Sequence, residues 1–345
     1  MARQPSGEYD TQPGHLRAQI EARGAFRGEH VPAYDIYEFD PLLDSANMTP
    51  QDWLAMATTI RDHYDDYDGF LIVHGTDTMA FSASALSFML DPLDKPVIFT
   101  GSQIPLVETR TDAQSNLLTA LLILGAYADR MSGVFLYFDD RLLRGTRATK
   151  VNADTFDAFA SPNFPPVGTV GINVEINWPL VPAPNESPRM PDVVALGSAT
   201  VAAFRVFPGL DASYLTHVLA PPVQGVVLEC YGAGNAPSNN EAFLEALRAA
   251  TEQGTVIVDV TQPLHGTADL DLYATGHALA RAGVVSGYDL TTEAALAKLY
   301  YLFEQGHAPE EVRRLMQENL RGELTPPDEV PPNLGRSRQR LAGYR

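Results

Sequence analysis

The sequence predicts an α/β protein of two domains, each with a mainly parallel sheet flanked by helices. Short runs rich in β-branched and aromatic residues alternate with longer helical patterns, which is typical of parallel sheets covered by helices. The length of 345 residues exceeds that of a typical single domain. A proline-rich stretch separates two such blocks, and 45% hydrophobic residues suffice for a core in each.

The first block, residues 1–177, is the expected amino-terminal domain. Its predicted strands cover residues 69–73, 96–100 and 134–138, and its predicted helices cover residues 79–90 and 112–127. An α/β domain usually opens with a strand, but residues 1–30 contain none of convincing length. The first strand of this domain is therefore expected to be missing.

Residues 178–195 are the expected linker, because their prolines exclude a helix or a central strand: Pro179, Pro182, Pro184, Pro188 and Pro191. A smaller carboxyl-terminal α/β domain is expected at residues 196–328. Its predicted strands are 201–207, 225–230 and 255–260, and its predicted helices are 211–219, 291–303 and 309–320. Ser238 and Glu241 predict a capping box that starts a further helix. Residues 329–345 are expected to form a mobile tail.

Composition limits the partners and the compartment. The net charge of −19 argues against nucleic acid or an anionic membrane, because phosphate binding needs a basic face. Cys230 is the only cysteine, so the fold needs no oxidising compartment. The amino terminus lacks the apolar core of a signal peptide, and the longest apolar stretch, 117–128, is too short to span a bilayer. A cytoplasmic protein with a small-molecule substrate is expected.

The segment His74-Gly75-Thr76-Asp77-Thr78 carries the densest group of reactive side chains. It lies between a predicted strand and a predicted helix, and open α/β sheets place their sites at such strand ends. Two interpretations stay open. Thr76 and Asp77 are typical helix caps; alternatively, Gly75 lets a ligand approach the backbone, and the helix amides hold a carboxylate or an oxyanion.

Other segments offer partners for this group. A threonine nucleophile needs a base, and Lys150 is a candidate whose alternative role is that of a solvated surface lysine. Asp44 and Ser45 are explained equally well by a turn. Ser102 follows the strand at 96–100 and is expected at the same sheet edge as Thr76.

The sequence predicts neither a metal nor a cofactor. The eight histidines lack the paired spacing of metal ligands, and no phosphate-binding loop is present. The glycines at 232 and 234 begin a dinucleotide fingerprint, but Pro237 stands where its last glycine belongs.

Five segments together resemble the bacterial L-asparaginases of the cytoplasmic type I branch. They are HGTDTMA at 74–80, TGSQIP at 100–105, the stretch 144–150, YGAGNAP at 231–237 and YATG at 273–276. The resemblance runs from about Gly14 to Asp328. It implies two α/β domains, a homodimer or homotetramer with sites between subunits, and no metal. It also implies hydrolysis of L-asparagine to L-aspartate and ammonia by a threonine nucleophile through an acyl-enzyme.

The same resemblance implies roles for individual residues. Thr76, Asp77 and Lys150 match the catalytic group of the family. Asp44 and Ser45 match the pair that holds the α-amino and α-carboxyl groups of the substrate. The remaining matches are Gly75, Ser102 in the adjacent loop, Asn235 reaching a neighbouring subunit's site, and Tyr9 near the tyrosine of the mobile lid.

The chain departs from the family at its beginning. The first family strand ends in Thr-Gly-Gly-Thr-Ile-Gly, and its second threonine is the one most often assigned as the primary nucleophile; no such motif occurs here. A start assigned too late, at an internal methionine, is the favoured explanation. The alternative is a catalytically weak protein that binds asparagine and serves in regulation.

A second departure concerns the allosteric asparagine pocket of some type I enzymes. The positions matching its polar contacts include Thr149, but Glu229 and Pro263 stand where an arginine and a cysteine are expected. A carboxylate repels the substrate carboxylate that a guanidinium attracts. Hyperbolic kinetics are therefore expected rather than cooperative kinetics.

Overall fold

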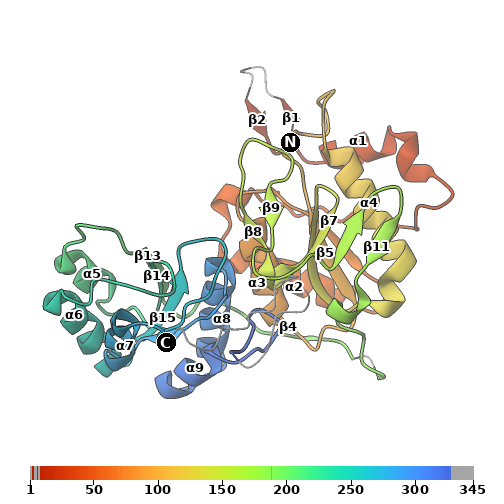
Figure 1. Ribbon diagram of the computed structural model, residues 1–345. Coiled ribbons are helices and arrows are strands. Elements are labelled where there is room, and N and C mark those ends of the chain that lie inside the picture. Colours follow the sequence, from red (N-terminus) through yellow and green to blue (C-terminus); the bar gives the residue numbers. More distant parts are fainter. Residues whose placement is uncertain (1, 4–5, 7, 188, 328–345) are drawn as a thin grey trace. The chain divides into compact units, whose positions relative to one another are not determined.

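The computed structural model describes residues 2–3, 6, 8–187 and 189–327, which form two compact units (Figure 1). The first unit comprises the residues up to Ala160 together with Pro166–Leu196. The second comprises Ser161–Pro165 and the residues from Gly197 onward. Each unit has its own sheet, as expected for a two-domain α/β protein. The predicted tail at 329–345 lies outside the described residues.

The main sheet of the first unit has the order β11-β10-β7-β6-β5-β3. Its strands are β3 (Phe70–Val73), β5 (Pro96–Thr100), β6 (Gly133–Phe138), β7 (Arg141–Arg144), β10 (Gly168–Val170) and β11 (Val174–Ile176). β3, β5 and β6 are parallel, and the remaining three strands continue the sheet in antiparallel pairs. Val73 pairs with Thr100, so β3 and β5 end side by side. This register confirms that the segments after both strands start at one edge.

The helices of this unit are α1 (His15–Glu21), α2 (Pro50–Asp62), α3 (Met79–Met89) and α4 (Ala113–Tyr127). α3 packs against β6 and α2, and it is apolar on nearly every side. A helix without a polar face is buried all round. Accordingly Ala83, Leu86 and Phe88 are fully buried.

Short strand pairs complete the first unit. They are β1 (Ala2–Arg3) with β2 (Tyr9–Asp10), β4 (Leu90–Asp91) with β12 (Asp192–Val193), and β8 (Thr149–Lys150) with β9 (Phe159–Ala160). The β4–β12 pair joins the proline-rich stretch to the first unit. In the same stretch the Trp178 ring lies 3.7 Å from the Arg130 guanidinium. The boundaries predicted for the linker and the two domains stay a prediction.

β3 is the last strand of its sheet within the described residues. Val73, at its end, keeps 47% of its surface exposed, whereas all five residues of β5 are buried. β3 thus has the exposure of an edge strand although its sequence is typical of a central one.

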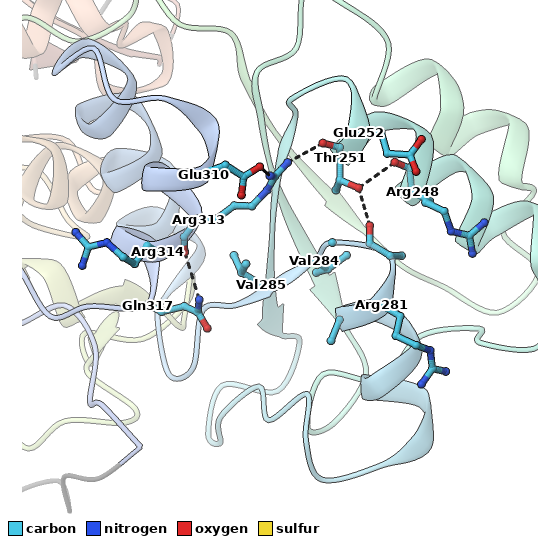
Figure 2. A pocket seen from close by; sticks show the side chains of 13 residues that line it. Arg248, Thr251, Glu252, Arg281, Val284, Val285, Glu310, Arg313, Arg314 and Gln317 are labelled. Carbon is cyan, nitrogen blue, oxygen red and sulfur yellow. Dashed lines mark hydrogen bonds and ion pairs between the residues drawn. The ribbon is translucent and has the colours of Figure 1, made fainter.

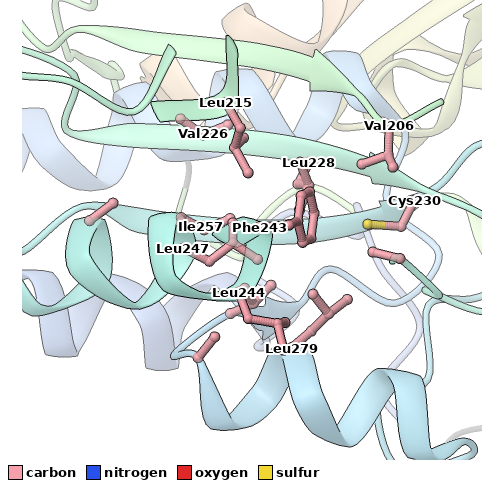
Figure 3. Close-up of a cluster of buried hydrophobic side chains, with 14 of the residues drawn as sticks. Val206, Leu215, Val226, Leu228, Cys230, Phe243, Leu244, Leu247, Ile257 and Leu279 are labelled. Carbon is pink, nitrogen blue, oxygen red and sulfur yellow. The ribbon is translucent and has the colours of Figure 1, made fainter. Parts of the chain in front are cut away.

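The second unit contains a fully parallel sheet of β13 (Val201–Arg205), β14 (Gly225–Cys230), β15 (Val256–Thr261) and β16 (Val285–Ser286). Its helices are α5 (Ala212–Val218), α6 (Glu241–Glu252), α7 (Ala274–Arg281), α8 (Thr292–Glu304) and α9 (Pro309–Met316). Alternate residues of β14 enter two cores. Val226 and Leu228 belong to the core that includes α6, where Phe243 faces Leu228 (Figure 3), whereas Val227 belongs to the core with α8 and α9.

The predicted capping box of α6 is wrong. Asn240 is the N-cap residue, and its side chain accepts a hydrogen bond from Phe243 N at 3.2 Å. Ser238 lies two residues earlier, where its backbone N–H donates to Ala236 O. Asparagine caps a helix at least as well as serine, so the nearer residue takes the position.

No helix among the described residues is long and apolar enough to cross a membrane.

Candidate active site

Thr76, Asp77 and Lys150 lie in direct contact. Lys150 Nζ donates to Thr76 Oγ1 at 2.9 Å and to Asp77 Oδ1 at 2.8 Å. Lys150 reaches them from β8, which β9 holds through the pairing of Lys150 with Phe159. The lysine side chain keeps only 21% of its surface exposed, whereas that of Asp77 keeps 65%. Lys150 is therefore a partnered residue, and the Asp77 carboxylate remains open to a second cation.

The helix-cap interpretation of Thr76 and Asp77 is wrong. The N-cap residue of α3 is Thr78, and α3 has no side-chain capping bond. Thr78 Oγ1 instead donates to Ser45 O at 2.7 Å. The side chains of Thr76 and Asp77 are consequently directed to Lys150 rather than to the amides of α3.

Gly75 brings the segment of Asp44 and Ser45 against the strand end. A Cβ atom at Gly75 would lie 2.7 Å from Ser45 Cβ, which no side chain tolerates. Asp44 caps a short 3₁₀ helix, Ser45–Asn47, by accepting from Ala46 N at 3.2 Å. Its other oxygen accepts from Asn47 Nδ2 at 2.8 Å. Asp44 and Ser45 thus form a turn, as one interpretation expected, and this turn lies beside Gly75.

The loop that carries Ser102 is held from α4. Asp112 accepts from Gln103 N at 3.0 Å and from Ile104 N at 2.9 Å, and Asn116 Nδ2 donates to Gly101 O at 3.0 Å. Gly101 lies against the backbone of His74, where a Cβ atom would collide. The loops after β3 and β5 are therefore packed together, as their sequence order predicted.

Tyr9 and Asn235, two further predicted site residues, have partners of their own in the structure. Tyr9, on β2, donates its hydroxyl to Glu108 Oε1 at 2.5 Å and is 39% exposed. Asn235 belongs to the second unit, where its backbone pairs with Tyr231 and its side chain accepts from the Thr275 hydroxyl. Asn235 therefore ends a tight turn that its own backbone closes.

A buried acid lies beneath this turn. Asp259, on β15, is completely buried, and neither of its carboxylate oxygens has a hydrogen-bond partner among the described residues. Burial raises its pKa to about 7, partly offset by the neighbouring Cys230 thiol. A Cβ atom at Gly234 would lie 2.5 Å from Asp259 Oδ2, so the turn rests directly on the acid.

Sequence reasoning missed a hydrogen-bonded chain behind Thr76. Trp53 Nε1 donates to Ser82 Oγ at 3.0 Å, Ser82 Oγ lies 2.9 Å from His74 Nε2, and His74 Nδ1 lies 2.6 Å from Gly75 O. Burial lowers the pKa of His74. Only the position of His74 in the reactive segment hinted at a role, because Trp53 is distant in sequence and Ser82 lies in the helix that follows.

The second unit has a cavity of about 700 Å³ between α6, α7 and α9 (Figure 2). Four arginines line it, and three of them are ion-paired: Arg248 with Glu245, Arg313 with Glu310, and Arg314 with Glu311. None of the predicted site residues lines this cavity.

The geometry of the Thr76 group suits acyl transfer. It joins a hydroxyl, an amine that can accept its proton once neutral, and a carboxylate, at the carboxyl ends of parallel strands. In the described part of the chain, no three histidine, cysteine, aspartate or glutamate residues cluster in a way that could hold a metal ion.

The fold and this group define a two-domain α/β hydrolase of the asparaginase type. The family model described as "Asparaginase, N-terminal" matches residues 6–182, and the "Glutaminase/Asparaginase C-terminal domain" matches residues 200–316. The chain belongs to the asparaginase family.

Its relatives agree with this membership. The chain is 48% identical to L-asparaginase 1 of Escherichia coli (strain K12) over 329 residues, covering 95% of each. It is 46% identical to the 60 kDa lysophospholipase of Homo sapiens, with 85% of this chain and 51% of the relative aligned. The crystal structure of L-asparaginase I from Vibrio cholerae superposes with a TM-score of 0.84 at 44% identity, covering 92% of this chain and 94% of that one.

Proposed function

We propose that the protein hydrolyses L-asparagine to L-aspartate and ammonia, with Thr76 as a nucleophile. The observation that carries this proposal is the position of Lys150 Nζ, within 2.9 Å of Thr76 Oγ1 and 2.8 Å of Asp77 Oδ1. The similarity to L-asparaginase 1 of Escherichia coli and L-asparaginase I of Vibrio cholerae supports the choice of substrate.

The reaction proceeds in two halves. Neutral Lys150 accepts the hydroxyl proton while Thr76 Oγ1 bonds to the side-chain amide carbon of asparagine. The C–N bond then breaks, the nitrogen takes a proton from the lysine, and ammonia leaves an aspartyl ester on Thr76. Water adds to this ester, the C–O bond to Thr76 breaks, and aspartate leaves with the threonine hydroxyl restored.

Charged hydrogen bonds hold the substrate in this proposal. Asparagine offers little apolar surface, so its α-amino and α-carboxyl groups must fix its orientation. Asp77 is available for the amino group because its carboxylate is 65% exposed. Asp44 and Ser45, beside Gly75, and Ser102, in the loop against His74, complete the proposed pocket.

Two further parts of the proposal concern a neighbouring subunit and a lid. We place Asn235 in the site of a neighbouring subunit of a homodimer or homotetramer, and Tyr9 in a lid over the substrate. Both positions follow the family resemblance, as does the cytoplasmic location.

A catalytically weak asparagine-binding protein is the second candidate. The observation that favours it is the exposed edge of β3, directly before the reactive segment. The family resemblance implies that this domain has a strand ending in Thr-Gly-Gly-Thr, which would supply a further threonine to the site.

Ammonia release by the 345-residue chain distinguishes the two candidates. We expect the 345-residue chain to release ammonia slowly. A form in which a strand ending in Thr-Gly-Gly-Thr precedes the chain should release it at a much higher rate. Thr76→Val should remove activity in both forms, whereas Thr76→Ser keeps the hydroxyl and part of the rate. If asparagine raises the melting temperature but neither form releases ammonia, the binding function replaces the enzymatic one.

A further inference from the structure

Three side chains from separate elements connect the core to the peptide that precedes Thr76. Trp53 comes from α2, Ser82 from α3, and His74 from the segment after β3. Their contacts are 3.0 Å from Trp53 Nε1 to Ser82 Oγ, 2.9 Å from Ser82 Oγ to His74 Nε2, and 2.6 Å from His74 Nδ1 to Gly75 O. Ser82 is fully buried, and His74 is 7% exposed.

The chemistry of these groups fixes the direction of two bonds, and the neutral form of His74 fixes the third. The indole N–H is a donor only, so Ser82 Oγ accepts from Trp53. The carbonyl of Gly75 is an acceptor only, so His74 Nδ1 must carry a proton. His74 Nε2 is then free to accept the hydroxyl proton of Ser82. A single neutral tautomer of the imidazole satisfies all three contacts.

The surroundings of His74 favour this neutral form. Two of the elements packed around it, α3 and β5, contain no charged residue. On α2, Asp52 is bonded to Thr49, and Arg61 is paired with Asp62. On its own segment, Asp77 is paired with Lys150. Burial lowers the pKa of His74, and the hydrogen bond to Gly75 O offsets this only in part.

The chain of bonds acts on the position of Thr76. His74 N donates to Thr100 O at 2.8 Å, which fixes the segment to β5 on one side. The imidazole fixes the carbonyl of Gly75, and this carbonyl belongs to the same planar peptide as the nitrogen of Thr76. The backbone before the hydroxyl is thus held twice.

We propose that His74 and Ser82 are positioning residues of the active site, which hold the Gly75–Thr76 peptide so that the Thr76 hydroxyl meets Lys150 and the substrate. This inference rests on the proposed function. Neither side chain contacts the substrate in this proposal. Their loss should therefore reduce kcat far more than it raises KM, because a displacement of about 1 Å at a reacting group costs up to roughly 100-fold in rate.

The test compares two serines of α3 that are both fully buried. Ser82→Ala removes the link between Trp53 and His74, whereas Ser84→Ala removes a hydroxyl that makes only a 3.4 Å contact to Gly145 O. We expect Ser82→Ala to lower kcat roughly 10- to 100-fold with KM within about threefold. Ser84→Ala should stay near the wild-type kcat, and Ser82→Thr, which keeps the hydroxyl, should recover most of the rate.

A measurement without substrate separates this inference from the proposed function. The ¹⁵N shifts of the histidine rings, assigned with His74→Asn, should show the Nδ1–H tautomer for His74 in the wild type. In Ser82→Ala this tautomer preference should weaken. An Nε2–H tautomer in the wild type, or equal kcat for both alanine variants, overturns the positioning role. A wild type with this tautomer but without ammonia release overturns the proposed function alone.

Discussion

The reactive group depends on individual side chains whose partners lie far away in sequence. Lys150 reaches Thr76 and Asp77 across more than seventy positions, through bonds of 2.9 and 2.8 Å. Its ammonium donates both bonds, so it must lose a proton before it can accept one from Thr76. In the proposed reaction, this arrangement is the one from which Lys150 starts.

Replacement of Lys150 tests its role as the base. Lys150→Met keeps the aliphatic stem but removes the amine, and we expect kcat to fall roughly 10²- to 10⁴-fold because proton transfer is lost. Thermal unfolding controls for misfolding. Lys95→Met is a matched comparison, since Lys95 also donates two bonds, to the carbonyls of Tyr64 and Tyr67. A Lys150→Met enzyme with wild-type kcat would exclude lysine as the base.

His74 makes a prediction for stability in acid. Its pKa is lowered in the folded state, so the unfolded chain takes up a proton first as the pH falls below about 6.5. The contribution of neutral His74 to the free energy of unfolding is complete above that pH and is lost on acidification. The advantage of the wild type over His74→Asn in melting temperature should therefore be larger at pH 8 than at pH 5. An advantage that does not change with pH would show that His74 is not neutral and buried in solution.

At the scale of elements, the sequence predicted the parts that have strong local signals. The strand at 96–100 is found as β5 with the predicted ends, and the helix at 79–90 ends one residue earlier as α3. Continuous apolar runs between breakers account for both. The start of α6 was missed because Ser238 and Asn240 are both good cap residues, and only the path of the chain selects between them.

The candidate site could also be predicted only in part, because only some of its residues have a strong local signal. Thr76 and Asp77 are adjacent in a recognisable segment, but the chain from Trp53 through Ser82 to His74 links residues of different elements. No periodicity of the sequence encodes such a link. It exists only once α2, α3 and β3 have packed together.

The turn above Asp259 provides a prediction at this scale. Burial raises the pKa of Asp259 to about 7 in the folded state. The folded state therefore holds a proton that the unfolded chain releases near pH 4. Stability should therefore fall as the pH rises from 4 to 7, by up to about 1.4 kcal/mol per pH unit from this group.

Asp259→Asn removes this ionisation while keeping the shape of the side chain. The difference in unfolding free energy between Asp259→Asn and the wild type should favour the variant more at pH 8 than at pH 4.5. Denaturant unfolding at the two values measures it, with Asp211→Asn as a comparison at an exposed helix cap. A difference that is equal at both pH values would show that Asp259 ionises normally.

For the whole molecule, the net charge of −19 bears on the proposed assembly. Subunits of like charge repel one another, and salt screens this repulsion over about 8–10 Å. The local contacts that hold an oligomer together must therefore outweigh the repulsion between its negatively charged subunits. Its dissociation should become easier as salt is removed.

Mixed oligomers test whether Asn235 serves a neighbour. In a dimer that pairs Thr76→Val with Asn235→Ala, one of the two sites receives both native side chains if Asn235 acts across the interface. Random mixing makes half of the dimers mixed, so about a quarter of the wild-type activity should return from two variants that are each inactive. If Asn235 acts within its own subunit, no site is complete and nothing returns. Mixing Thr76→Val with Lys150→Met is the matched control, because both residues lie in one unit within 2.9 Å of each other, and no exchange of subunits can reunite them.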